Sequence, residues 1–155
     1  MRDGFVKIAC ATPELRVADC DYNTDKIIDM IKDAYSAGVK IVCFPELSIT
    51  GYTCGDLFFQ SALENSAHEN LLRIVRDTAE MEIVSVVGLP FSYVGKLYNC
   101  AAVIFRGEIL GIVPKTNIPN YSEFYEARYF ALGFESVVDA IVDGKNVTFG
   151  TNQIF

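Results

Sequence analysis

The sequence predicts an α/β protein built on a mixed β-sheet, and three observations support this fold class. Residues 5–44 read as a strand, a helix and a second strand with short connections, which is the pattern of a parallel βαβ unit. A second helix and another apolar strand follow within residues 61–90. Beyond them, apolar segments are separated by short glycine-containing turns, which is typical of antiparallel hairpins.

The first part of the chain carries the βαβ pattern. Residues 5–11 alternate between apolar and polar side chains and stop before a Thr-Pro pair, which predicts a strand. Asn23 or Thr24 is expected to cap the helix that follows, and Gly38 to close it. The inner face of this helix is predicted from apolar side chains at helical spacing, at Ile27, Ile28, Ile31, Ala34 and Tyr35.

The rest of the sheet is predicted from continuous or alternating apolar runs. Strands are expected over residues 39–44, 82–90, 97–105 and 108–114, and in a hairpin within 136–155. Hairpin turns are expected at Gly95-Lys96, Arg106-Gly107 and Asp143-Gly144. The second helix, residues 61–81, should point an inner stripe at the sheet, formed by Leu63, Ala67, Leu71, Ile74 and Thr78. We expect both helices on one face, and the other face covered as well, because its strands are also apolar.

Composition excludes several classes of protein. The chain has 155 residues, about one domain, and is 51% hydrophobic, so it lacks the low hydrophobicity of a disordered chain. A formal charge of −7 without any basic run argues against a nucleic-acid partner. No apolar stretch approaches the roughly 18 residues that a membrane span needs. The N-terminus reads as a strand and not as a signal peptide, so a cytoplasmic location is expected.

The cysteines show no pattern of metal binding or disulfide pairing. Their number is odd, no CxxC pair occurs, and His68 is the only histidine, so no metal site is expected. We interpret them as reduced thiols with packing or loop roles, since free cysteine is among the most buried residue types. They are Cys10, Cys20, Cys43, Cys54 and Cys100.

Two charged residues stand where predicted buried strands end at a proline. Glu46 follows Pro45, and Lys115 follows Pro114. Ligands of open α/β sheets bind outside the carboxyl ends of strands, so Glu46 could act as a general base there. It could equally be a helix cap or a surface carboxylate. Lys115 could be a cation aimed at a developing negative charge, or a surface lysine with its stem on the sheet.

Residues 115–130 have no clean period and are crowded with aromatic side chains, which predicts a long loop. Glu123 lies inside it. Aromatic rings with interleaved carboxylates can wall a small polar pocket. The alternative is an aromatic loop that only packs onto the core.

Taken together, two segments resemble a known family. The stretches CFPELSITGYTCGDLF and PKTNIPNYSEFYEARYF are similar to the carbon–nitrogen hydrolase (nitrilase) superfamily. The TCGDLF and PNYSEFYE parts resemble more specifically the N-terminal glutaminase domain of glutamine-dependent NAD synthetases, and the resemblance spans the whole chain. It implies an α-β-β-α sandwich, of which this chain would supply the first sheet and part of the second.

The resemblance also implies roles for individual residues in a Glu–Lys–Cys triad. Glu46 matches the general base that activates the thiol, and Lys115 the lysine that stabilises the tetrahedral intermediate. Glu123 matches the supporting second glutamate. The glutamine pocket would be formed by Tyr121 and, with less support from the motif, by Phe124 and Tyr52.

The nucleophile of this triad is expected outside the chain. In the family it follows the lysine segment in a later strand-to-turn motif, and none of the five cysteines stands in that context. Residues 1–155 would thus be a partial glutaminase domain, inactive by itself and expected to expose apolar surface. Cys54 would mark the NAD synthetase branch without being the nucleophile.

The resemblance further implies partners for this domain. Glutamine would be the substrate, and its ammonia would pass to a C-terminal synthetase domain of the same parent chain. That domain would use ATP and magnesium to convert nicotinic acid adenine dinucleotide into NAD. No cofactor is expected in residues 1–155, which contain no Gly-rich phosphate loop. Because members of the superfamily are commonly homo-oligomers, the resemblance also implies a homo-oligomer here.

Two alternatives remain open. The chain could belong to another hydrolase of the same superfamily, an amidase, nitrilase or carbamoylase. It could also be a non-catalytic α/β module that serves only in assembly, which would suit a chain without its nucleophile. Titration with glutamine would distinguish the two, because an assembly module should show no binding and a glutaminase domain should bind it.

Overall fold

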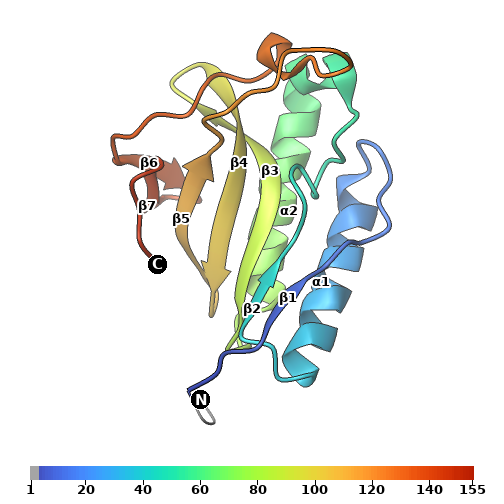
Figure 1. Cartoon of the computed structure of the whole chain (residues 1–155), viewed down its shortest axis with the longest axis vertical. Coiled ribbons are helices and arrows are strands. Elements are labelled where there is room, and N and C mark those ends of the chain that lie inside the picture. Colours follow the sequence, from blue (N-terminus) through green and yellow to red (C-terminus); the bar gives the residue numbers. More distant parts are fainter. Residues whose placement is uncertain (1–3) are drawn as a thin grey trace.

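The computed structural model describes residues 4–155 and contains a single seven-stranded mixed sheet (Figure 1). The first three strands are parallel and the next two antiparallel, as expected from the change from helical crossovers to short turns. The strand order is β1-β2-β3-β4-β5-β7-β6. The strands are β1 (Ile8–Cys10), β2 (Ile41–Cys43), β3 (Val84–Tyr93), β4 (Lys96–Phe105), β5 (Glu108–Pro114), β6 (Val138–Val142) and β7 (Lys145–Phe149).

Helix α1 (Cys20–Ser36) forms the first crossover, from β1 to β2. The side chain of Asp19 caps its start by accepting the Tyr22 backbone N–H at 3.1 Å. The prediction of Asn23 or Thr24 as the cap is therefore wrong. Both are fully buried, and Asn23 uses its amide to bond the Arg16 and Ile49 carbonyls.

Helix α2 (Ser61–Asp77) forms the second crossover, from β2 to β3. It lies beside α1 on one side of the sheet (Figure 1). The predicted inner stripe is confirmed, because all five of its side chains are buried: Leu63, Ala67, Leu71, Ile74 and Thr78. Neither helix in the described part of the chain has the length and apolar character that a membrane span would need.

Tight turns connect the antiparallel strands. Arg106-Gly107 and Asp143-Gly144 both have two consecutive positive φ angles, near 50° and 75°, the signature of a type I′ hairpin turn. These two predictions are confirmed. The remaining turn is centred on Val94-Gly95, one residue earlier than predicted, with φ of 47° and 73°.

The side of the sheet away from the helices is partly open. Val42 points to the helices and is fully buried, whereas its strand neighbour Ile41 points to the opposite face and is 39% exposed. Ile8 is paired with Ile41 on that face and is 67% exposed. The expectation that both faces are covered thus fails over β1 and β2 in residues 4–155. No separate second sheet occurs within these residues, since β7 joins β5 through one residue pair, Ile112 and Phe149.

Candidate active site

Glu46 lies on a tight loop that follows β2. The Leu47 carbonyl accepts the backbone N–H groups of Thr50 and Gly51, and Leu47 itself has a φ of 52°, which is rare for a non-glycine residue. The loop rests directly on β3 at Gly88. A Cβ atom at Gly88 would stand 2.3 Å from the Leu47 nitrogen, so only glycine fits there.

Two further bonds fix this loop to β3. The Ile49 N–H donates to the Gly88 carbonyl at 3.1 Å, and the Gly88 N–H donates to the fully buried Ser48 hydroxyl at 3.1 Å. Glu46 is therefore presented at the carboxyl end of the parallel strands by a rigid support.

Lys115 lies at the corresponding end of β5. Its backbone N–H donates to the Asn99 carbonyl on β4 at 2.8 Å, and its carbonyl accepts the Gly133 N–H at 2.8 Å. Both backbone polar groups of Lys115 are thus hydrogen-bonded, which fixes the residue at the end of β5. Since β4 separates β3 from β5, the side chains of Glu46 and Lys115 approach each other across β4.

The structure brings Glu46 and Lys115 into direct contact. Lys115 Nζ lies 2.7 Å from Glu46 Oε2 and 3.1 Å from each carboxylate oxygen of Glu126. Burial lowers the pKa of Lys115, but its hydrogen bonds to the two carboxylates and their charges outweigh burial and raise that pKa. Lys115 therefore stays a cation at neutral pH. The Glu46 side chain is 51% exposed, so its carboxylate remains open to a reactant.

The second carboxylate of this cluster is Glu126, whereas the sequence predicted Glu123. Glu126 is 5% exposed and accepts a hydrogen bond from the Tyr52 hydroxyl at 2.6 Å. Glu123 is exposed and makes no contact with Lys115. Its pKa is lowered by hydrogen bonds from the Ser122 hydroxyl and its own backbone. In the structure, Glu126 therefore makes the contact with Lys115 that the sequence predicted for Glu123.

Contacts between two short helical turns explain why Glu126 faces inward. Turn η2 (Glu126–Arg128) packs against η1 (Gly55–Phe59), which follows the Glu46 loop. Arg128 pairs with Asp56 through two hydrogen bonds of 3.0 and 3.2 Å. The ring of Phe58 also packs edge-on against Phe130 at 4.9 Å. These contacts orient the loop, and Glu126 with it, toward Lys115.

The three residues predicted to bind substrate lie around this cluster in two hollows. Tyr52 and Phe124 line a cavity of about 200 Å³ together with Glu126. Tyr121 lies in a second, shallower hollow beside Lys115 and is 68% exposed. The rings of Tyr121 and Phe124 meet edge-on at 5.6 Å, which joins the two sides.

A third hollow opens from Glu46 and Lys115 onto the uncovered face of the sheet. It has a volume of about 240 Å³ and a mainly apolar wall that includes Val86, Val113 and Pro45. The carboxylate–ammonium pair therefore stands at the border between an apolar sheet face and the polar hollow around Glu126.

Sequence reasoning missed two residues of this cluster, Asn99 and Glu126. Asn99 is 2% exposed and donates its side-chain amide to Glu46 Oε2 at 3.0 Å. The available signal was a single polar residue in an otherwise apolar strand, since buried polar groups need a partner. For Glu126 no pattern in the loop distinguishes it from Glu123.

The cysteines show no sign of an activated nucleophile near this cluster. Burial raises the pKa of four thiols, the opposite of the lowered pKa that reactive cysteines show. They are Cys20, Cys43, Cys54 and Cys100. Within residues 4–155, no three His, Cys, Asp or Glu side chains are grouped closely enough to hold a metal ion.

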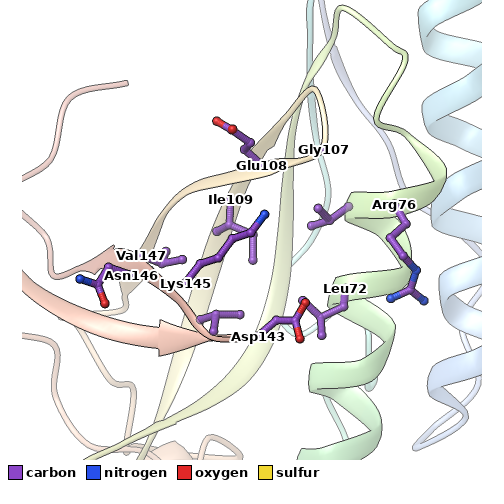
Figure 2. A pocket seen from close by; sticks show the side chains of 11 residues that line it. Leu72, Arg76, Gly107, Glu108, Ile109, Asp143, Lys145, Asn146 and Val147 are labelled. Carbon is purple, nitrogen blue, oxygen red and sulfur yellow. The ribbon is translucent and has the colours of Figure 1, made fainter.

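A further pocket lies away from this site, between α2 and the β6–β7 hairpin (Figure 2). Its volume is about 330 Å³, and its wall combines apolar side chains such as Leu72 and Ile109 with the charged Arg76, Asp143 and Lys145. None of the residues predicted to act in catalysis or substrate binding lines it.

Comparison with known proteins gives a consistent match along the chain. Residues 7–148 match the family described as "Carbon-nitrogen hydrolase". Glutamine-dependent NAD(+) synthetase of Mycobacterium tuberculosis is 36% identical over 152 residues, which cover 98% of this chain and 22% of the relative. The enzyme of the same name from Aquifex aeolicus is 39% identical over 145 residues, covering 94% and 25%.

Structural comparison agrees. The crystal structure of a glutamine-dependent NAD(+) synthetase from Cytophaga hutchinsonii superposes with a TM-score of 0.89 at 30% identity, over 94% of this chain and 25% of that one. The chain thus spans about a quarter of the length of these relatives.

Proposed function

Because the chain belongs to the carbon–nitrogen hydrolase family, we propose that it forms part of a glutaminase that releases ammonia from the side-chain amide of glutamine. The similarity of nearly the whole chain to glutamine-dependent NAD synthetases supports glutamine as the substrate. The ammonia would serve ATP-dependent synthesis of NAD from nicotinic acid adenine dinucleotide in a longer protein.

The observation that carries this proposal is the ion-paired contact of Glu46 with Lys115. A carboxylate that is half exposed, yet fixed beside a lysine, can take up a proton and return it. The lysine cation, held by two carboxylates, can offset charge that develops on a nearby oxygen. Base and cation are the two parts that hydrolysis of an amide by a thiol requires.

The reaction proceeds in two stages with Glu46 as the proton carrier. First, Glu46 takes the proton of a cysteine thiol, and the sulfur attacks the amide carbon. Lys115 stabilises the resulting oxyanion, and Glu46 returns the proton to the nitrogen as ammonia leaves. In the second stage Glu46 takes a proton from water as the water oxygen attacks the acyl carbon. Glu46 then returns this proton to the departing sulfur, so that glutamate is released and the thiol is restored.

The cysteine of this reaction is proposed to lie outside the 155 residues. None of the five cysteines stands in the sequence context of the family's nucleophile, and burial raises the pKa of Cys20, Cys43, Cys54 and Cys100. The 155-residue chain by itself should therefore release no ammonia from glutamine. Turnover by this chain alone would overturn the assignment.

We assign the remaining partners to the same longer protein. The chain covers 22% of the Mycobacterium tuberculosis relative, which leaves room for a C-terminal synthetase domain that binds ATP and magnesium. The five free cysteines fit a reducing, cytoplasmic location. A homo-oligomer is also proposed, and its order is to be measured by light scattering.

The test uses the full-length protein that contains these residues. Wild type should release ammonia from glutamine and support glutamine-dependent NAD synthesis, whereas Glu46→Gln should do neither and still make NAD from free ammonia. Loss of both activities in Glu46→Gln would indicate a structural role. Faster hydrolysis of other amides or nitriles than of glutamine would favour a different carbon–nitrogen hydrolase, and absence of glutamine binding an assembly module.

A further inference from the structure

Asn99 touches both members of the Glu46–Lys115 pair. Its side-chain amide donates to Glu46 Oε2 at 3.0 Å, and its backbone carbonyl accepts the Lys115 N–H at 2.8 Å. We propose that Asn99 is the positioning residue of the base: it fixes Glu46 by Oε2, so that Oε1 is the oxygen that carries the proton. This inference rests on the proposed function.

The two oxygens of Glu46 have different surroundings. Oε2 accepts two hydrogen bonds, from Asn99 and from Lys115 at 2.7 Å. No side chain among residues 4–155 donates to Oε1. An oxygen that already accepts two donors, one of them charged, has its lone pairs engaged and is the poorer proton acceptor. Proton transfer therefore falls to Oε1, which is free to face a thiol or a water.

Lys115 alone cannot hold Glu46 in this orientation. Its ammonium group has three N–H bonds and makes three contacts, one with Glu46 and two with the carboxylate of Glu126. A single bond to a shared cation leaves the Glu46 carboxylate free to rotate about its own axis. The bond from Asn99 removes that freedom, because two fixed donors then meet on one oxygen.

The position of Asn99 in the fold makes it a rigid donor. It lies on β4, paired with β3 on one side and β5 on the other, and is opposite Pro90. Its side chain is 2% exposed, so water cannot readily replace the amide. An acceptor oxygen turned toward a carboxylate would be repelled, so the nitrogen of the amide must face Glu46. Asn99 thus orients the Glu46 carboxylate through its side chain and holds the backbone of Lys115 through its carbonyl.

The experiment replaces Asn99 in the full-length protein and measures both routes of NAD synthesis. Asn99→Leu keeps the size of the side chain and removes the donor. We expect kcat for ammonia release from glutamine to fall about tenfold to a hundredfold, within the range of general base catalysis, while KM for glutamine stays unchanged. NAD synthesis from free ammonia should be unaffected, because it bypasses the hydrolysis of glutamine in which Asn99 is proposed to act.

A matched control separates positioning from general stability. Asn70 is 4% exposed and donates to the Asp21 carboxylate at 2.9 Å, between the two helices. Asn70→Leu removes an equally buried amide–carboxylate bond, and its kcat should equal that of wild type. Where Asn99→Leu fails to fold, Asn99→Ala carries the same test, since it removes the donor without adding a charge next to Glu46.

The outcomes distinguish this inference from the proposed function. An active wild type, an inactive Glu46→Gln and an Asn99→Leu with wild-type kcat would overturn the role of Asn99 alone. A rise in KM without a fall in kcat would make Asn99 a binding residue and contradict the inference equally. A wild type without glutaminase activity would overturn both.

Discussion

Lys115 Nζ lies 2.7 Å from Glu46 Oε2, although 69 residues separate them in the chain. The contact is possible because β2 and β5 end at the same edge of the sheet, with β3 and β4 between them. Glu126 and Asn99 add further hydrogen bonds to this pair. The cluster carries two carboxylates and one ammonium, so its single cation balances both negative charges in part.

The first prediction concerns this cation. Lys115→Met keeps most of the side-chain length and removes the charge, so the oxyanion loses its counter-charge and the two glutamates lose their common partner. Ammonia release from glutamine by the full-length protein should fall about a hundredfold to a thousandfold. Lys96→Met is the matched control, because Lys96 is exposed at the start of β4. A Lys115→Met variant with wild-type turnover would contradict the assigned role.

The second prediction compares the two glutamates of the long loop. Glu126→Gln should lower kcat about tenfold or more, which corresponds to about 1.4 kcal/mol of transition-state stabilisation. The reason is that Lys115 then keeps only one carboxylate partner, Glu46, and the Tyr52 hydroxyl loses the Glu126 carboxylate as its acceptor. Glu123→Gln should retain turnover, since Glu123 is exposed and does not contact Lys115. The reverse result would restore Glu123 as the supporting carboxylate.

The fold could be predicted from the sequence wherever apolar side chains repeat with a clear period. The stripe of α2 and the turn at Arg106-Gly107 are examples, because each depends on residues that are adjacent or one helical turn apart. The turn at Val94-Gly95 was displaced because a β-branched valine adopts a positive φ there, against its local preference. The cap of α1 was missed because Asn23 is bound to Arg16 and Ile49 instead, a tertiary contact.

The candidate site divides in the same way. Glu46 and Lys115 could be predicted because each follows a strand, and strand ends share an edge. Glu126 could not be separated from Glu123, because both stand in an irregular loop whose side-chain directions depend on Tyr52 and η1. Asn99 has a donor role only once Glu46 is placed beside it.

The third prediction concerns alkaline pH. Burial, and then the hydrogen bond to Glu126, raises the pKa of Tyr52 above its ordinary value. The folded protein therefore keeps this proton where the unfolded chain has lost it. The contribution of Tyr52 to stability is full below about pH 10 and decreases as the pH rises further. In urea unfolding followed between pH 8 and 11, Tyr52→Phe should show a shallower loss of stability than wild type. An unchanged slope would contradict this.

The fourth prediction excludes Cys54 as the nucleophile. Cys54 is 5% exposed, and its Sγ donates to the carbonyls of Thr50 and Gly51 at 3.2 and 3.3 Å. Burial raises its pKa, so the thiol stays protonated at neutral pH. Cys54→Ser keeps a single O–H donor in place of the S–H group that faces these two carbonyls, and it should hydrolyse glutamine at the wild-type rate in the full-length protein. Loss of turnover with unchanged thermal stability would make Cys54 part of the reaction.

The fifth prediction concerns the support of the Glu46 loop. A methyl group at Gly88 would stand 2.3 Å from the Leu47 nitrogen and 2.5 Å from the Pro45 carbonyl oxygen, and neither backbone atom can yield without moving Glu46. Gly88→Ala should therefore lower the free energy of unfolding by about 1–3 kcal/mol.

Gly88→Ala should also reduce glutamine-dependent turnover more than its stability alone explains, because the displaced Glu46 no longer meets Lys115. Ala102→Gly provides the control. It changes a buried residue of β4, on the helix side of the same sheet, without pressing on the loop. Both variants should be less stable than wild type in thermal unfolding. Only Gly88→Ala should lose ammonia release from glutamine while retaining NAD synthesis from free ammonia. If ammonia release falls equally in Gly88→Ala and Ala102→Gly, the Glu46 loop tolerates the methyl group and the prediction is wrong.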